Sequence, residues 1–201
     1  MPLLLELFSG TGSVGKVATE MGYTVISLDR DMRASIQIDI MDWDYTDFQP
    51  HMFDVIWASP PCTEYSRAKT VGVRDIEGSN KVVKRTLDII EYFQPKYWIV
   101  ENPQTGLLKD QDIMVWIPFN DVDYCRYGMP YRKRTRLWNN VDLWKPKPLC
   151  FRDCGAMNEA KARQKQEAQQ NVPPELIKEI LLACDLEAIN ASEDEDEVII
   201  L

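Results

Sequence analysis

The 201-residue sequence lacks any apolar run close to the roughly 20 residues that a membrane-spanning helix needs. Its start is apolar only as far as Glu6, so it does not resemble a signal peptide. The chain has one histidine, His51, and five cysteines, an odd number without the spacing of a disulfide scaffold. We therefore expect an intracellular protein with free thiols and no membrane partner.

A metal site is also poorly supported by the sequence. Cys150 and Cys154 form a C-x3-C pair, but no second pair accompanies them and His51 is remote in the sequence. A structural zinc site usually needs four such ligands. The pattern favours two incidental thiols, and we expect no metal.

Positive charge is scarce, because the chain has 23 Lys and Arg residues but 32 Asp and Glu residues, which gives a net charge of -9. The charge is nevertheless uneven. Residues 185–201 hold seven acids and no base, whereas residues 126–168 hold eleven bases and four acids. The basic segment could contact phosphates, although a solvated basic face would have the same composition. The acidic end could meet a protein partner.

Apolar runs alternate with helix-like segments in the first half of the chain, which is typical of a parallel α/β sheet. We expect strands at residues 3–7, 24–28, 53–58 and 97–100, and helices at 12–21 and 80–93. Short β-like pieces follow around 115–117, 121–125 and 135–138. Residues 145–170 form either a helix or a mobile loop. Pro173-Pro174 opens a helix over 175–183.

A glycine-rich loop, Gly10-Thr11-Gly12-Ser13-Val14-Gly15, follows the first expected strand. Such a loop lets the backbone approach a nucleotide or nucleoside at a helix N-terminus. Val17 occupies the position where a P-loop needs a magnesium-binding Ser or Thr, so ATP hydrolysis is disfavoured. A dinucleotide or S-adenosylmethionine remains, with Asp29 able to bind ribose hydroxyls.

Two reactive side chains come directly after expected strands. Cys62 ends the segment Ser59-Pro60-Pro61-Cys62, and Glu101 begins Glu101-Asn102-Pro103. Because α/β enzymes place reactive groups at the carboxyl ends of strands, we expect this thiol and this carboxylate to face one pocket.

In this order the motifs resemble those of the cytosine carbon-5 DNA methyltransferases, over nearly the whole chain. For the cofactor, Phe8-Ser9-Gly10-Thr11-Gly12 is similar to the binding loop, Asp29 to the ribose acid and Asp39-Ile40 to the pair beside the adenine. For the chemistry, Pro61-Cys62 is similar to the nucleophile motif, with Pro60 also at the cofactor, and Glu101-Asn102 to the acid motif. Arg134-Thr135-Arg136 is similar to the arginine pair near the target base, and Asn171-Val172-Pro173-Pro174 to the closing motif. The continuation Thr63-Glu64-Tyr65-Ser66 and the short chain look most like small stand-alone enzymes of large DNA viruses.

The resemblance implies an α/β, Rossmann-like methyltransferase fold with a mainly parallel sheet and a much reduced target-recognition region. We expect a catalytic and cofactor-binding core at residues 1–138, a basic recognition segment at 139–170, a closing helix at 171–187 that packs back on the core, and a disordered acidic tail at 188–201. Glu6 and Ser13 depart from the family's usual residues.

The resemblance also implies the chemistry. The Cys62 thiolate adds to carbon-6 of a cytosine flipped out of double-stranded DNA, Glu101 stabilises the charge on the base, and Arg134 or Arg136 lowers the pKa of the thiol. S-adenosyl-L-methionine then gives its methyl group to carbon-5.

Two alternatives stay open at this point. The same motifs serve transfer-RNA cytosine methyltransferases, and a non-catalytic DNA-binding regulatory protein could keep the fold. The reduced recognition region indicates a short target site such as CG, or a second protein that selects the target. A viral enzyme of this kind would work in the nucleus or cytoplasm of a host cell.

Overall fold

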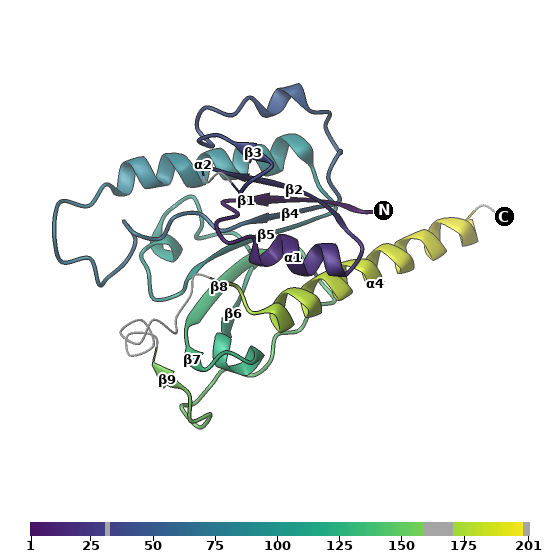
Figure 1. The fold of residues 1–201 in the computed structure, drawn as a ribbon. Coiled ribbons are helices and arrows are strands. Elements are labelled where there is room, and N and C mark those ends of the chain that lie inside the picture. The colour runs from purple at the N-terminus through teal and green to yellow at the C-terminus, as the bar shows by residue number, and fades with distance from the viewer. Residues whose placement is uncertain (31–32, 159–170, 199–201) are drawn as a thin grey trace.

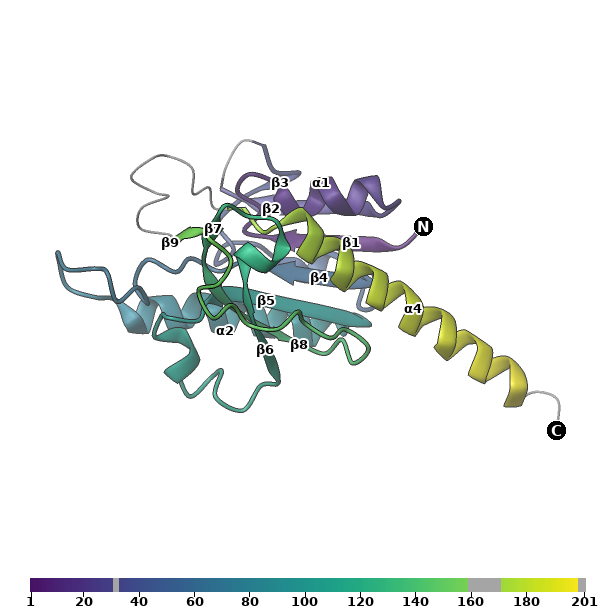
Figure 2. The ribbon, with the colours of Figure 1, turned by 90° about the horizontal axis from the view of Figure 1, so that it is seen from below.

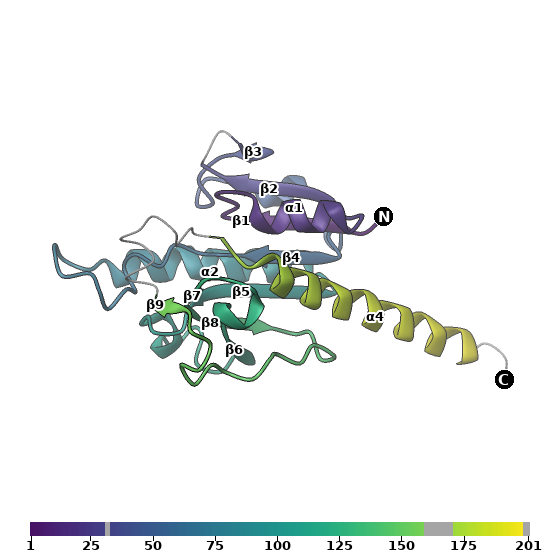
Figure 3. The ribbon, with the colours of Figure 1, turned by 60° about the horizontal axis from the view of Figure 1, so that its bottom comes forward.

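A seven-stranded sheet forms the centre of the computed structural model, which describes residues 1–30, 33–158 and 171–198. The strand order is β3-β2-β1-β4-β5-β8-β6, and Figure 3 shows the strands in this sequence from top to bottom. The strands are β1 (Leu3–Leu7), β2 (Thr24–Asp29), β3 (Ile36–Gln37), β4 (Val55–Ala58), β5 (Tyr97–Pro103), β6 (Phe119–Asp123) and β8 (Arg134–Asn139). β1 to β5 are parallel, whereas β8 is antiparallel to its neighbours β5 and β6. The expected mainly parallel α/β sheet is confirmed.

Helices cover both faces of this sheet (Figure 1). Helix α2 (Ile76–Phe93) lies on one face, and α1 (Ser13–Glu20) and α4 (Pro174–Val198) lie on the other. Three short 3-10 helices, η1 (Tyr45–Asp47), η2 (Leu108–Asp110) and η3 (Tyr124–Tyr127), lie in the connections. β7 (Tyr131–Arg132) and β9 (Met157–Asn158) pair in parallel as a separate small sheet. Both faces of the central strands are therefore buried, which explains the continuous apolar run of β4.

Several boundaries differ from the sequence expectations. α2 begins at Ile76, earlier than the expected residue 80, because the Asp75 side chain accepts the Gly78 N–H at 2.7 Å and caps the first turn. Residues 115–117 form a turn instead of a β piece. The part of the predicted recognition segment at 159–170 lies outside the described residues.

The C-terminal helix is much longer than expected. We predicted a helix over 175–183 and a disordered tail over 188–201, but α4 continues to Val198. After Pro174 the sequence holds no glycine or proline that would end a helix, and its Ala, Leu and Glu residues favour helical backbone. The second half of α4 projects beyond the sheet, as Figures 1 and 2 show.

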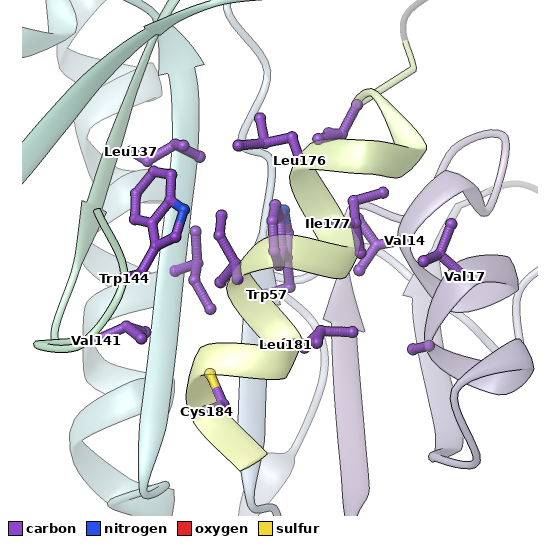
Figure 4. Close-up of a cluster of buried hydrophobic side chains, with 14 of the residues drawn as sticks. Val14, Val17, Trp57, Leu137, Val141, Trp144, Leu176, Ile177, Leu181 and Cys184 are labelled. Carbon is purple, nitrogen blue, oxygen red and sulfur yellow. The ribbon is translucent and has the colours of Figure 1, made fainter. Parts of the chain in front are cut away.

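The first half of α4 packs on the core (Figure 4). The fully buried Leu176, Ile177 and Leu181 lie against Trp57 of β4 and against side chains of α1 and β8. The first half of α4 therefore forms part of the core. No helix in the described part of the chain has the length and apolar character to cross a membrane.

We expect Leu181→Ala to lower the free energy of unfolding by about 3 kcal/mol, because it leaves a cavity between α4 and the sheet. The matched control is the neighbouring Leu182→Ala, whose side chain is 54% exposed and should change stability by less than about 0.5 kcal/mol. Urea unfolding of both variants measures this. Equal losses in the two variants would contradict the packing of α4.

Candidate active site

A cavity of about 550 Å³ lies at the carboxyl ends of β1, β2, β4 and β5. This is the edge at which open α/β sheets bind ligands. Most of the residues predicted from the sequence line it, namely Phe8, Ser9, Gly10, Thr11, Asp29, Asp39, Ile40, Pro60, Cys62, Glu101 and Val172. The structure therefore brings the expected nucleophile, acid and cofactor residues into one space.

The register of the sheet explains why Cys62 and Glu101 face the same cavity. Ala58, the last residue of β4, is level with Val100 of β5, so the loop that carries Cys62 and the end of β5 that carries Glu101 lie at the same edge of the sheet. Asn102 is fully buried, and its Nδ2 donates to the carbonyl oxygen of Pro60 at 2.8 Å. This hydrogen bond ties the cysteine-bearing loop to β5.

The carboxylate of Glu101 is buried in a polar cluster. The Tyr124 hydroxyl donates to Glu101 Oε1 at 2.9 Å, and Lys133 Nζ lies 3.4 Å from the same oxygen. Burial and the nearby Glu101 hold the pKa of Tyr124 well above its usual value, so its phenol stays a hydrogen-bond donor. Both Tyr124 and Lys133 line the cavity, and the sequence motifs indicate neither of them as a site residue.

The two predicted arginines are not at the cavity, which corrects the sequence expectation. Arg134 forms two hydrogen bonds with Asp123, at 2.7 and 3.1 Å, and Arg136 forms two with Asp121, at 2.7 and 2.9 Å. Neither arginine is among the residues that line the cavity.

Strand alternation explains this difference. Leu137 of β8 is level with Glu101, whereas Arg136 is level with Asp121 of β6. Successive side chains point to opposite faces of a sheet. Leu137 therefore shares a face with Glu101, and so do Thr135 and Lys133, which lie two and four residues before Leu137. The motif Arg134-Thr135-Arg136 indicates the two arginines, whereas the alternation of side chains along β8, extended back by one residue, indicates Lys133.

The glycine-rich loop adopts the tight conformation that its sequence indicated. Gly10 and Gly12 have positive φ angles of 48° and 69°, and Phe8 is in the same region at 60°, which is uncommon for a residue with a side chain. Gly10 N donates to Asp29 Oδ2 at 3.0 Å, which joins the loop to the end of β2. Gly12 lies just outside the cavity as the N-cap of α1.

The closing segment meets this loop directly. The Thr11 hydroxyl donates to Asn171 Oδ1 at 2.5 Å, and Val172 N donates to the Ser13 hydroxyl at 3.3 Å. Asn171 itself does not line the cavity, whereas Val172 does. Ser13 and Val172, which are 159 positions apart in the sequence, thus form one wall of the cavity.

The donor set of this part of the cavity fits an adenosine group. The carboxylates of Asp29 and Asp39 can accept hydrogen bonds from ribose hydroxyls, and Ile40, Pro60 and Val172 provide apolar surface for a purine.

Glu6 lies beneath the loop and is only 4% exposed. Its carboxylate accepts the N–H groups of Val14 at 3.2 Å and Gly15 at 3.0 Å, at the start of α1. Burial raises the pKa of Glu6 to about 7, although the two N–H donors oppose this shift. A Cβ at Gly15 would come within 2.7 Å of the Glu6 carboxylate, so glycine is needed there.

Comparison with known proteins identifies the family. The model of the C-5 cytosine-specific DNA methylases matches residues 5–127. A curated protein of Frog virus 3 (isolate Goorha), named "Probable DNA (cytosine-5)-methyltransferase", is 40% identical over 159 residues, which cover 72% of this chain and 73% of that protein. This chain belongs to the C-5 cytosine-specific DNA methylases, a family of DNA (cytosine-5)-methyltransferases. The expected similarity to an enzyme of a large DNA virus is confirmed.

A solved structure with a TM-score above 0.5 supports the fold. The crystal structure of a prophage-encoded "DNA modification methyltransferase" of E. coli superposes with a TM-score of 0.55 at 16% identity, over 75% of this chain and 52% of that one. The S. pombe Dnmt2 methyltransferase gives a TM-score of 0.49 at 15% identity, over 86% of this chain and 57% of that one. This chain thus spans about half the length of these two proteins. The Rossmann-like methyltransferase fold is confirmed.

The raised pKa of Glu6 predicts a pH-dependent stability. The folded protein holds this proton more tightly than the unfolded chain, so Glu6 should destabilise the wild type increasingly as the pH rises from 4.5 towards 7. We expect the stability of wild type relative to Glu6→Gln to fall by at most about 3 kcal/mol over this window. Urea unfolding at several pH values measures the difference. A constant difference across the window would contradict the buried carboxyl.

Proposed function

We propose that this protein methylates carbon-5 of cytosine in DNA, using S-adenosyl-L-methionine and a covalent bond between Cys62 Sγ and carbon-6 of a flipped base. One observation carries the proposal: Cys62 and the buried Glu101 share a cavity with a loop suited to a nucleoside. Family membership supports the same reaction.

The cofactor would occupy the β1–β2 side of the cavity. The loop from Phe8 to Gly12 would enclose it, Asp29 and Asp39 would hold the ribose and adenine side, and Asn171 would act through its bond to Thr11. When bound, S-adenosylmethionine supplies an electrophilic methyl group on a sulfonium.

The first step is addition of the Cys62 thiolate to the base. Carbon-5 of cytosine is a poor nucleophile, and forming an Sγ–C6 bond moves electron density onto carbon-5 and nitrogen-3. A positive charge in the cavity favours a thiolate over a thiol. We assign this charge to Lys133, which lines the cavity, in place of Arg134 or Arg136.

Glu101 would stabilise the base during this addition. A proton shared between its carboxyl and ring nitrogen-3 would offset the charge that develops there. Tyr124 and Lys133 both contact Oε1 of Glu101, so they fix the carboxyl and leave Oε2 for the base. After methyl transfer, loss of the carbon-5 proton to solvent returns an electron pair, which breaks the Sγ–C6 bond and frees Cys62.

DNA would approach the open edge of the sheet, and the base would flip into the cavity at a cost of roughly a few kcal/mol. Only residues 140–170 separate β8 from the closing motif, so we propose a short target such as CG. α4 begins just after Val172 at the cavity and runs for 25 residues, about 37 Å. The acidic end of the helix would therefore stay away from the DNA phosphates.

Transfer of a labelled methyl group tests this function. We expect wild-type protein to label unmethylated duplex DNA, and Cys62→Ala and Glu101→Gln to lose nearly all activity. Binding of S-adenosylhomocysteine, followed by calorimetry, should survive in Cys62→Ala and so show that the variant is folded. Label in transfer RNA alone, or label that does not depend on Cys62, would contradict the proposal.

A comparison of cations tests the assignment of Lys133. We expect Lys133→Met to lower the single-turnover rate of methyl transfer by about 100-fold, as loss of one charged donor at a reacting centre does. Arg136→Met serves as the control, since Arg136 lies outside the cavity, and we expect less than a tenfold effect at saturating DNA. A larger loss in the Arg136 variant than in the Lys133 variant would overturn the assignment.

A further inference from the structure

Three thiols from two separate segments of the chain come together beside the active site. The Sγ atoms of Cys125, Cys150 and Cys154 all lie within 4.8 Å of one another, and those of Cys150 and Cys154 are 3.3 Å apart. Cys125 belongs to η3, whereas the other two precede β9. The sequence analysis considered only Cys150 and Cys154, and the structure places a third thiol from another segment beside them.

We propose that these three cysteines bind one Zn²⁺ ion as thiolates, with the Asp153 carboxylate as the fourth ligand. Zinc–sulfur bonds of about 2.3 Å in a tetrahedron place the sulfurs about 3.8 Å apart, and the cluster needs only small side-chain movements to reach this geometry. Asp153 Oδ1 lies 3.5 Å from Cys150 Sγ, but its carboxylate also accepts two hydrogen bonds from Arg126 and must turn towards the three sulfurs to bind the ion. The other two cysteines belong elsewhere, Cys62 to the catalytic cavity and Cys184 to the α4 core.

Backbone N–H groups already point at two of the sulfurs. Arg152 N donates to Cys150 Sγ at 3.3 Å, and the Ala156 backbone forms a hydrogen bond with the Cys154 sulfur. In both cases the donor is two residues after the cysteine. Such N–H donors stabilise thiolates and orient them as metal ligands.

Three sulfurs lie close together in this cluster, and as thiolates they would repel one another. A divalent ion would displace the thiol protons and offset this repulsion. Two arginines lie near the negative charge that the zinc and its four ligands would keep. Arg126 lies 2.9 Å from Asp153, and Arg134 Nη2 lies 3.5 Å from the Cys150 carbonyl oxygen.

The position of the site suggests what the metal does. Cys150 N donates to Asp123 Oδ2 at 2.8 Å, and the next residue along, Tyr124, contacts the catalytic Glu101. A zinc ion at this point would fasten the recognition segment to η3. It would replace packing that so short a segment cannot supply. The role is structural, and it can be tested without reference to methyl transfer.

Metal analysis of the full-length protein, purified anaerobically without chelators, tests the site. We expect about one zinc per chain in the wild type and in Cys62→Ala, and loss of most zinc in Cys125→Ser, Cys150→Ser and Cys154→Ser. Replacement of zinc by Co²⁺ should give thiolate-to-cobalt charge-transfer bands and the visible bands of a tetrahedral ion. Asp153→Asn should keep the charge-transfer bands but shift the visible ones and weaken binding by about 10-fold or more.

A second measurement covers the case in which a cysteine variant does not fold. Removal of zinc from the wild type with a strong chelator should make the chain near residue 150 accessible to protease, and added Zn²⁺ should reverse this. A reduced, metal-free wild type that gives no cobalt–thiolate bands would overturn the proposal. So would a Cys150–Cys154 disulfide in the anaerobically purified protein.

Discussion

The register of the parallel strands is the constraint on which the rest of this structure depends. Leu7 of β1, Ala58 of β4 and Val100 of β5 lie level in the sheet, so three chain segments reach the same edge. Each segment carries a different part of the proposed chemistry: the loop for the nucleoside, the nucleophile and the acid. A slip of one residue in any pairing would turn the following side chain to the opposite face.

Buried polar contacts then hold these segments in place. Glu6 joins β1 to the start of α1, Asn102 joins β5 to the cysteine loop, and Tyr124 joins η3 to Glu101. Each contact satisfies a buried group whose partner comes from another element, so removing one side leaves a costly unpaired group. The cavity is therefore preorganised before substrate arrives, which is the property that electrostatic catalysis requires.

The sequence predicted the parallel sheet, the glycine loop and the pairing of Cys62 with Glu101, because strand-to-loop transitions are local and carry clear motifs. It does not predict which side chains at the start of β8 face the acid, because the motif Arg134-Thr135-Arg136 does not reveal which face of the sheet each residue occupies. Lys133, the residue just before β8, is therefore not indicated. The gathering of Cys125 with Cys150 and Cys154 depends on how η3 meets a remote loop, which no local pattern encodes. The sequence underestimates the length of α4, because the acidic composition of its second half is also typical of disordered segments.

The central claim, that Cys62 forms a covalent bond to a flipped cytosine, is tested most directly with duplex DNA that contains 5-fluorocytosine at the target. Fluorine at carbon-5 cannot leave as a proton does, so the Sγ–C6 bond should persist after methyl transfer. With S-adenosylmethionine present, we predict a stable protein–DNA adduct, and mass spectrometry of its peptides should place the modified base on Cys62. An adduct on another cysteine, or none under conditions in which ordinary cytosine is methylated, would contradict the account.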